Sequence, residues 1–367
     1  MSSLVSVGGD EMIELPADGV YVCQTSSLTS SMTRYPYYAG TEVIGHNDAV
    51  LCNRAIVNNS FLIDHCPSHW RFEQAVTDES DNGDYIAEVE SAFSCAVTRR
   101  TRQRKGALGL LFSGGIDCSL VAYFMMTSLQ TDEELHLFTV AFAKDDEAAF
   151  AKCPDRVTAE SSFQILRNLF PHVKLRLHRI NVYQGEMAKE REHIKNLIRP
   201  LKSVLDHSIG AALWYASQAA RSCGVRVLLS GLGADELFAG YSQHRRTFDR
   251  EGEVALGADL QNMIERIGER NCGRDDRVIS DSGAEYRMPF LDLDFIHIVS
   301  QIPLNIRCDL SKPRGIGEKL LLRKLARKLG LGEIAGLEKR AIQFGSRIAK
   351  MTEGKKQKGD FMSSDLK

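Results

Sequence analysis

The sequence predicts an α/β protein with a doubly wound parallel sheet, a helical C-terminal part and a partial β-rich segment at its start. Three observations predict this fold. Apolar runs of strand length alternate with helical patterns between residues 108 and 229. Two of these runs end in glycine-rich turns that carry carboxylates, and the pattern after residue 255 is mostly helical. Such a sheet binds ligands at the carboxyl ends of its strands.

The first 80 residues differ in texture from the rest of the chain. Short β-prone pieces alternate there with clusters of Ser, Thr, Asn and Pro, and the pieces span residues 19–24, 50–57 and 60–63. The polar stretch from Thr77 to Asp84 marks a boundary. We therefore predict a β-rich segment at 1–83, a main domain at 84–350, and a disordered, Lys- and Ser-rich tail at 351–367.

The elements of the main domain follow from apolar periodicity. A first helix is predicted from one apolar stripe followed by a run of arginines, the stripe comprising Tyr85, Ile86, Val89, Phe93 and Val97. Strands are predicted at 108–112, 135–142, 174–182 and 225–229, and helices near 157–170, 185–198 and 208–222. Nearer the C-terminus, a single helical face is formed by Leu321, Leu322, Leu325 and Leu329.

Composition excludes several classes of function. The 46 basic and 48 acidic residues nearly balance, so we expect no nucleic-acid and no membrane partner, and small ligands instead. No apolar run of about 18 residues and no signal-like start occur, which favours a cytoplasmic location. The nine cysteines form no C-x-x-C pair, so structural zinc is not expected.

The turn after the first predicted strand has the composition of a phosphate cradle. Gly114 and Gly115 lie between a buried strand and a helix start, where unpaired backbone N–H groups favour an anion. Ser113 and Ser119 can add hydroxyl donors. Asp117 would repel a bare phosphate, so its presence suggests a bridging Mg²⁺. The alternative is an ordinary strand-to-helix turn.

A second glycine-rich loop follows the strand at 225–229. It extends from Ser230 to Tyr241 and carries Asp235 and Glu236. Asp235 can share a Mg²⁺ with Asp117, because a nucleotide polyphosphate needs a cation between its oxygens and protein carboxylates. The alternative is that Asp235 and Glu236 simply cap a helix.

These two loops and three later motifs resemble the synthetase half of the asparagine synthetase family. That family belongs to the ATP-pyrophosphatase, or PP-loop, class, whose fold is of the adenine nucleotide alpha hydrolase-like type. The resemblance spans about residues 85–350, and within the family the chain is similar to a divergent eukaryotic branch. The five matching stretches are Ser113 to Asp117, Ser230 to Tyr241, Glu285 to Asp292, Glu318 to Arg323 and Lys339 to Ser346.

The resemblance implies an ATP-dependent amidating ligase. Aspartate would attack the α-phosphate of Mg²⁺-bound ATP, pyrophosphate would leave, and ammonia would displace AMP from β-aspartyl-AMP. The chain lacks the G-x-x-x-x-G-K-[ST] loop of P-loop kinases, which is consistent with chemistry at the α-phosphate. Glutamine would supply the ammonia only through an amidotransferase domain.

The resemblance also implies roles for individual residues. Lys319 and Lys339 would be catalytic, stabilising the phosphate oxygens in the transition state. For Lys319 the alternative is an exposed lysine on an amphipathic helix. Asp117 and Asp235 would hold the metal. The remaining ATP- and pyrophosphate-binding positions would be Phe112, Ser113, Gly114, Gly115, Cys118, Ser119, Val140, Ser230 and Gly231, together with Asp117. Arg287 and Asp292 are expected to form a structural ion pair.

The chain departs from the family pattern inside both loops. Cys118 stands where a serine usually follows the loop aspartate, which replaces a hydroxyl donor by a weak thiol. Leu232 stands where the family usually has a glutamate that handles a proton in amidation. Asp206 or His207 is a hypothetical replacement for that glutamate, because both precede the strand that leads into the second loop.

The third departure is at the start of the chain. Position 2 is Ser, whereas a glutamine-dependent member has a cysteine nucleophile after the initiator Met. Residues 1–83 are too few for a complete amidotransferase domain, so we expect them to be a remnant of one, and we expect no glutaminase activity. Either the sequence begins late or the protein uses free ammonia. Two other functions stay open: a degenerate ATP-binding or scaffold protein, and a PP-loop ligase that acts on another carboxylate.

Overall fold

The computed structural model describes residues 85–102, 106–129 and 133–351, together with the backbone of five short strands before residue 45. The chain divides into two compact units, Met1–Trp70 with Glu265–Gly273, and Arg71–Ile264 with Arg274–Lys367. The predicted boundary between residues 83 and 84 lies outside the described residues. Of the predicted tail, Met351 is described and is buried, and the residues after it lie outside the described ranges.

The first unit contains short antiparallel strands. β1 (Leu4–Ser6) pairs with β2 (Met12–Glu14), and a second sheet has the order β3 (Gly19–Thr25), β4 (Ser30–Pro36), β5 (Glu42–Ile44). The β-prone piece predicted at 19–24 is therefore confirmed as β3, whereas those at 50–57 and 60–63 lie outside the described residues. The π-helix η2 (Gly268–Cys272) belongs to this unit as well.

The second unit is built on a five-stranded parallel sheet. Its order is β10 (Glu285–Arg287), β9 (Val225–Leu229), β6 (Ala107–Leu111), β7 (Glu134–Ala143), β8 (Lys174–Tyr183), and neighbouring strands are all parallel. The four predicted strands are confirmed, with ends shifted by no more than one residue. β10 was not predicted, because a three-residue edge strand leaves no periodic signal.

The strand order places the two glycine-rich loops side by side. From β6 the chain proceeds outward through β7 and β8, and then returns to the other side of β6 to form β9 and β10. The direction of winding therefore reverses between β6 and β9. Ligands of doubly wound sheets bind in the crevice at such a reversal, outside the carboxyl ends of the strands. The loops that follow β6 and β9 flank that crevice.

Helices cover both faces of the sheet. α9 (Val204–Ser222) packs on β6 to β9, and its first turn is capped by Ser203 Oγ, which accepts a hydrogen bond from Asp206 N. α4 (Ile116–Ser128) packs on β6, and α5 (Ala148–Ala151) and α6 (Pro154–Leu169) on β7. The helix predicted at 185–198 is two helices, α7 (Gln184–Lys189) and α8 (Arg191–Leu197), which meet at Glu190.

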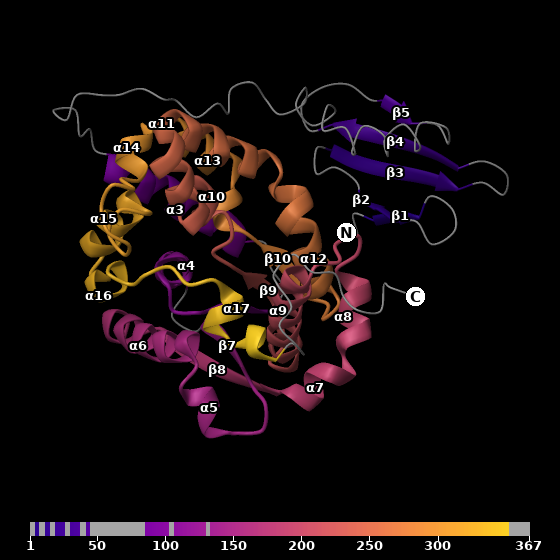
Figure 1. Ribbon diagram of the computed structural model, residues 1–367. Helices are drawn as coiled ribbons and strands as arrows, with labels where there is room; N and C mark the ends of the chain where they lie inside the picture. Colours follow the sequence, from indigo (N-terminus) through magenta and orange to yellow (C-terminus); the bar gives the residue numbers. More distant parts are fainter. Residues whose placement is uncertain are drawn as a thin grey trace. The chain divides into compact units, whose positions relative to one another are not determined.

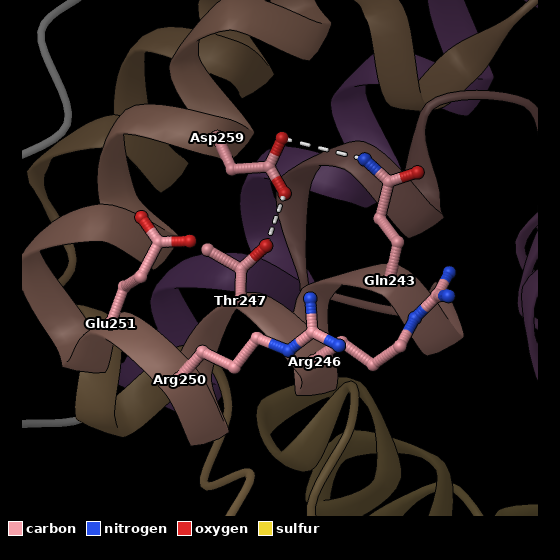
Figure 2. Close-up of a pocket in the computed structure, with 6 residues that line it drawn as sticks. All are labelled: Gln243, Arg246, Thr247, Arg250, Glu251 and Asp259. Atoms are coloured by element: carbon pink, nitrogen blue, oxygen red, sulfur yellow. Dashed lines mark hydrogen bonds between the residues drawn. The ribbon is translucent and has the colours of Figure 1, made fainter.

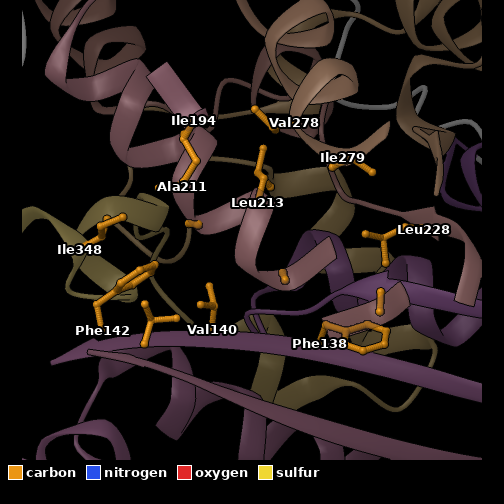
Figure 3. Packing of buried hydrophobic residues seen from close by; sticks show 14 of the residues in the cluster. Phe138, Val140, Phe142, Ile194, Ala211, Leu213, Leu228, Val278, Ile279 and Ile348 are labelled. Carbon is orange, nitrogen blue, oxygen red and sulfur yellow. The ribbon is translucent and has the colours of Figure 1, made fainter. Parts of the chain in front are cut away.

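Side chains along β7 point alternately to the two faces of the sheet, and helices cover both faces. Phe138, Val140 and Phe142 point toward α9 and pack with Ala211 and Leu213, as Figure 3 shows. The intervening Ala141 and Ala143 pack with Phe150 and Cys153 near the start of α6. A strand buried on both faces is rich in apolar residues, which is what the apolar run predicted, although β7 also buries His136 and Thr139.

The remaining chain is mostly helical, as predicted (Figure 1). α3 (Tyr85–Thr101) packs on α4 and buries Val89, Phe93 and Val97. The later helices are α10 (Ala234–Leu237), α11 (Ser242–Glu265), α12 (Gly273–Ser280), η3 (Pro289–Leu291), α13 (Leu293–Gln301), α14 (Leu304–Arg307), α15 (Leu320–Lys328), α16 (Gly332–Ala335), α17 (Ile342–Gly345) and η4 (Ile348–Lys350). Among the described residues, no helix combines the length and the apolar character that crossing a membrane requires.

The predicted ion pair between Arg287 and Asp292 is wrong. Asp292 is the N-cap of α13 and pairs with Arg99 and Arg100 of α3. Arg287 instead donates to Glu285 and to the carbonyl oxygen of Arg100 at 2.6 Å. The turn η3 separates Asp292 from β10 and places it next to the C-terminal end of α3, whose arginines reach it first. Both side chains are structural, as expected, but with other partners.

The buried face of β9 gives a stability prediction. Leu228 is fully buried in the core beneath α9, so Leu228→Ala removes apolar contacts and leaves a cavity. We expect the free energy of unfolding to fall by about 2–5 kcal/mol, measured by urea denaturation. Val254→Ala is the matched control, because Val254 is 65% exposed, and it should change stability by no more than about 0.5 kcal/mol. Equal losses in the two variants would contradict the assigned core.

Candidate functional site

The two glycine-rich loops touch one another. A Cβ added to Gly231 would lie 2.7 Å from Cβ of Asp117, a distance that real Cβ atoms do not reach. Only glycine at this position therefore lets the loop after β9 approach the start of α4 so closely. The convergence expected from the sheet topology is present in the structure.

The start of α4 is open to an anion. Gly115 is its N-cap, and no side chain of the described residues caps it by a hydrogen bond, while Gly114 has a φ of 77°, in the left-handed region that favours glycine. The carbonyl oxygen of Gly114 is anchored by the hydroxyl of Ser162, which donates to it at 2.7 Å. The first backbone N–H groups of α4 therefore point out of a fixed turn, an arrangement suited to phosphate oxygens.

The polar side chains of this turn are partly occupied. Ser119 is fully buried, and its hydroxyl donates to the carbonyl oxygen of Gly114 at 3.3 Å. Ser113 Oγ lies 3.6 Å from Cys118 Sγ and accepts from Gly115 N at 3.4 Å. Burial raises the pKa of the Cys118 thiol to about 11, so this thiol is neutral and is not a nucleophile. The backbone, more than these side chains, would bind the anion.

Lys319 joins the two loops. Its ammonium group lies 2.6 Å from Asp117 Oδ2 and 2.7 Å from Asp235 Oδ1, and its side chain is 1% exposed. The lysine is the N-cap of α15 and has a φ of 56°, uncommon for a residue other than glycine. Its backbone N–H donates to the carbonyl oxygen of Phe238 at 2.9 Å, which fixes this conformation. Lys319 is thus a buried cation and not the exposed lysine of the alternative interpretation.

Burial and opposite charges act against each other in this cluster. Burial alone would lower the pKa of Lys319, but Asp117 and Asp235 raise it above its ordinary value. Burial works against Asp235 as well, yet Lys319 and Lys339 hold its pKa below the usual range. The pKa of Asp117 is raised by burial, and Lys319 only partly offsets this. Asp117 Oδ1 is buried and, among the described residues, has no hydrogen-bond partner.

Lys339 approaches the same carboxylates from the last motif. Its ammonium group lies 2.5 Å from Asp235 Oδ2 and 4.3 Å from the centre of the Tyr241 ring. Gly240 makes room for this arrangement, because a Cβ there would lie 1.9 Å from Asp235 Oδ1 and 2.3 Å from Lys319 Cε. The structure therefore brings together both predicted catalytic lysines and both predicted metal ligands.

Arg323 fixes the segments that carry the two lysines. Its fully buried guanidinium donates to Glu318 Oε1 at 3.0 Å, and to the carbonyl oxygens of Ala335 and Leu337 at 2.7 and 2.9 Å. Glu318 also accepts from Gly315 N at 2.6 Å. Glu318 and Arg323 thus have structural roles that hold the start of α15 and the chain before Lys339.

The predicted adenosine-binding residues lie at the ends of β6, β7 and β9. Phe112 directly follows β6, and its N–H donates to Phe138 O at 2.8 Å. Val140 is near the carboxyl end of β7 and is buried. Ser230 directly follows β9, and its hydroxyl lies 2.6 Å from that of Tyr286. All three occupy the edge of the sheet that holds the lysine cluster, although the hydroxyl of Ser230 already has a protein partner.

Two buried carboxyl groups at this edge were not predicted as site residues. Burial and the charge of Asp235 raise the pKa of Glu236 to about 7, although Tyr241 donates a hydrogen bond to it at 2.7 Å. Burial raises the pKa of Asp155, at the start of α6, to about 7 against the opposing charges of Arg340 and Lys339. Sequence could have signalled Glu236 by its place in the second loop, but Asp155 lies outside the motifs that carried the prediction.

The two hypothetical replacements for the missing glutamate are Asp206, which has hydrogen-bond partners in the fold, and His207, which is buried. Asp206 accepts from Arg274 at 2.8 Å and from Ser203 Oγ at 2.5 Å. His207 is buried, and burial lowers its pKa. Leu232 itself packs against the apolar core. Glu236 and Asp155, whose pKa values are raised to about 7, are two further buried carboxyl groups at this edge.

A separate shallow pocket of about 220 Å³ lies on α11 (Figure 2). It is lined by Gln243, Arg246, Thr247, Arg250, Glu251 and Asp259. Gln243 and Thr247 both donate to Asp259, at 3.5 and 3.2 Å, so three of the six lining side chains bind one another. The pocket shares no residue with the lysine cluster, and we assign no function to it.

Comparison with known proteins agrees with this geometry. The sequence matches the profile of the family described as Asparagine synthase over two overlapping stretches, residues 88–262 and 248–354. These stretches contain both loops, Lys319 and Lys339. The chain belongs to the asparagine synthase family. The resemblance based on the five motifs is thereby confirmed.

Relatives of this family member include eukaryotic and archaeal proteins. It is 37% identical over 319 residues to asparagine synthetase domain-containing protein 1 of Mus musculus, covering 75% of this chain and 51% of that protein. Identity to the Homo sapiens protein of the same description is 39% over 300 residues, covering 69% and 47%. It is 27% identical over 219 residues to a putative glutamine-hydrolyzing asparagine synthetase of Methanocaldococcus jannaschii, covering 60% and 37%. The chain spans about half the length of the first two relatives.

The raised pKa of Glu236 makes stability depend on pH. An unfolded glutamate titrates near pH 4.3, whereas the folded value is about 7, so the folded state keeps a proton that the unfolded state releases between these values. Stability contributed by Glu236 is therefore lost as the pH rises from about 4 to about 7. We expect Glu236→Gln to be more stable than the wild type by about 1–3 kcal/mol at pH 8, with little difference at pH 4.

Urea denaturation of both proteins across this pH range is the measurement. Glu333→Gln, at an exposed position, is the control and should follow the wild type at every pH. A difference between Glu236→Gln and the wild type that does not change with pH would contradict the assigned burial of the charge.

Proposed function

We propose that this chain is an ATP-dependent ligase that activates the side-chain carboxylate of aspartate as β-aspartyl-AMP and amidates it with ammonia to give asparagine. The observation that carries the proposal is the position of Lys319 between Asp117 and Asp235, beside an uncapped helix start. This arrangement combines an anion site with buried cations and metal-type ligands at one edge of the sheet. Membership of the asparagine synthase family supports the reaction class.

The bound ATP would lie across the reversal between β6 and β9. Its β- and γ-phosphates would accept hydrogen bonds from the backbone N–H groups at the start of α4, with Gly114 and Gly115 allowing close approach. The adenosine would contact Phe112, Val140, Ser230 and Gly231 at the ends of the strands. The α-phosphate would then face Lys319 and Lys339, whereas the β- and γ-phosphates would face the backbone N–H groups.

Asp117 and Asp235 suit a Mg²⁺ ion that accompanies ATP. Carboxylate oxygens are the ligands that Mg²⁺ prefers, and the buried, unpartnered Oδ1 of Asp117 is an available one among the described residues. When bound, the ion would neutralise part of the charge of the polyphosphate. Lys319 holds the two carboxylates in place from the side that it occupies.

The two lysines would act on the developing charge. A carboxylate oxygen of aspartate forms a bond to the α-phosphorus, the bond from that phosphorus to the bridging oxygen breaks, and pyrophosphate leaves with the electron pair. Lys319 and Lys339 would stabilise the negative charge that accumulates on the phosphate oxygens. Both ammonium groups are already ordered by carboxylates, so little rearrangement is needed in the transition state.

Amidation requires a proton acceptor. Ammonia forms a bond to the activated carbonyl carbon, AMP leaves with the former carboxylate oxygen, and one proton of the attacking nitrogen must be removed. Leu232 cannot accept it. Glu236 and Asp155 are buried carboxyl groups at this edge of the sheet whose pKa values are raised to about 7, and we propose one of them as the acceptor of this proton.

One other function has a specific observation in its favour, and a second is compatible with the same geometry. Leu232 and the neutral thiol of Cys118 replace groups that the family usually has, which favours a degenerate protein that binds ATP without turnover. Substrate choice depends on the pocket walls, so a ligase acting on a different carboxylate uses the same lysines and loops. Each of these two functions predicts a different result from our proposal in the pyrophosphate exchange assay.

Exchange of labelled pyrophosphate into ATP separates the three functions. Adenylation is reversible, so we expect exchange that requires both Mg²⁺ and aspartate and that stops when EDTA removes the metal. Exchange driven by a different carboxylate, and not by aspartate, would favour the second ligase. Absence of exchange with any carboxylate, while ATP still binds, would favour the degenerate protein.

Lys319→Met tests the group on which the proposal rests. The change removes a buried cation from two carboxylates, and we expect aspartate-dependent exchange to fall by about 100-fold or more. Lys328→Met is the matched control on the same helix, because Lys328 is half exposed and pairs with Glu90. It should retain the wild-type rate. Undiminished exchange in folded Lys319→Met, or an equal loss in both variants, would rule out the assigned role.

A further inference from the structure

A second cluster of chemically reactive side chains lies on the face of the sheet that α9 covers. His136 is the third residue of β7, His178 is in β8, and Cys223 is the C-cap residue of α9, two residues before β9 begins. His136 and Cys223 lie toward the amino ends of β7 and β9, and His178 lies near the middle of β8. Asp117 and Asp235 follow the carboxyl ends of their strands, so the cluster is no part of the lysine site.

The three side chains form a short line. His136 Nδ1 lies 2.9 Å from His178 Nε2, and His178 Nδ1 lies 3.6 Å from Cys223 Sγ. One ligand atom from each residue can be chosen so that all three lie within 4.8 Å of one another. No local pattern in the sequence signals this cluster, because its members come from three elements and lie 42 and 45 positions apart.

Packing fixes the orientation of the two imidazoles. The rings of His136 and His178 are nearly parallel, with an angle of 10° between their planes. Phe138 stacks on His178 with its ring centre 4.7 Å away, and His136 is only 8% exposed. The donor atoms are thus held by a rigid sheet and by the end of a long helix, as a preorganised binding site requires.

We propose that His136, His178 and Cys223 bind a transition-metal ion of the zinc class, with water as the fourth ligand. Two imidazole nitrogens and one thiolate form a recognised donor set for Zn²⁺, which takes four ligands in a tetrahedron. With bonds of about 2.0–2.1 Å to nitrogen and about 2.3 Å to sulfur, the ligand atoms of such a tetrahedron lie about 3.3–3.6 Å apart. The two close contacts use different nitrogens of His178, so a single ion would take one of them, and ligand atoms that lie up to 4.8 Å apart would have to approach by up to about 1.5 Å through side-chain rotation.

The protonation states favour this binding. Burial lowers the pKa of both His136 and His178, which keeps the imidazoles neutral and able to coordinate. Burial raises the pKa of Cys223, so the S–H bond must break when the S–metal bond forms, and its proton leaves to solvent. Cys223 and His178 are partly exposed, which gives the ion and the proton a path.

The carboxylate of Glu134 lies next to the outer nitrogen of His136. Glu134 Oε2 lies 4.0 Å from His136 Nε2, the ring nitrogen that does not face His178. Metal-bound histidines usually present their second nitrogen to a carboxylate, which orients the ring and increases the basicity of the ligand. Glu134 also pairs with Arg176, so its charge is held in place.

Cobalt substitution tests the proposal with the full chain. Co²⁺ takes the place of Zn²⁺, and a cysteine ligand is expected to add a thiolate-to-cobalt charge-transfer band in the near ultraviolet. We expect this band in the wild type and in Cys95→Ser, the matched control at an exposed cysteine. We expect it to be lost in Cys223→Ser, and Zn²⁺ to bind there about 100-fold more weakly or worse, since even outer-shell changes cost about 10–100-fold.

A second measurement is the change in melting temperature when Zn²⁺ is added, which can also be made on a variant of low stability. Zn²⁺ added at saturating concentration should raise the melting temperature of the wild type and of Cys95→Ser, but not that of His178→Ala. Absence of the cobalt band in the wild type, or an equal band in Cys223→Ser, would overturn the proposal and leave the three residues as a metal-free hydrogen-bonded line. Neither result depends on ATP or aspartate, so failure here is distinct from failure of the proposed function.

Discussion

The candidate site depends on one ion-pair cluster, in which the buried ammonium group of Lys319 lies between the carboxylates of Asp117 and Asp235. A cation without exposure needs close anions, and removal of one partner from such a pair is costly. The carboxylates come from the loops after β6 and β9, so the lysine fixes the spacing of the two loops. Its own unusual backbone conformation is held by Phe238, and Arg323 braces the chain on either side. Gly240 and Gly231 supply the space without which this cluster would not close.

The topology of the sheet explains why these residues meet. Winding reverses between β6 and β9, and a doubly wound sheet opens a crevice at that point. The loop after β6 offers a helix start and the loop after β9 offers carboxylates, while α15 and the segment before α17 bring the lysines. The substitutions at Cys118 and Leu232 lie within these loops and leave the cluster intact. They change hydrogen-bonding and proton-accepting groups around the cluster. Two buried carboxyl groups of raised pKa, those of Glu236 and Asp155, lie at the same edge of the sheet.

Much of this organisation could be predicted from the sequence, because long periodic elements and glycine-rich turns leave local signals. The strands at 108–112 and 225–229 and the turns that follow them were predictable for this reason. Contacts between distant segments were not: Asp292 pairs with Arg99 and Arg100 of α3 and not with its sequence neighbour Arg287. β10 is too short for a periodic signal. The approach of His136, His178 and Cys223, and the burial that raises the pKa of Asp155, arise only when separate elements pack.

The central claim, that the carboxylate of aspartate attacks the α-phosphate of ATP at this cluster, has one direct measurement. The protein is incubated with ATP, Mg²⁺, ammonia and aspartate whose side-chain carboxylate carries ¹⁸O, and the nucleotide products are analysed by mass spectrometry. Attack at the α-phosphate followed by amidation leaves one labelled oxygen in AMP, and this is the result we predict. Label that appears in inorganic phosphate with formation of ADP, or AMP that forms without label, would contradict the claim.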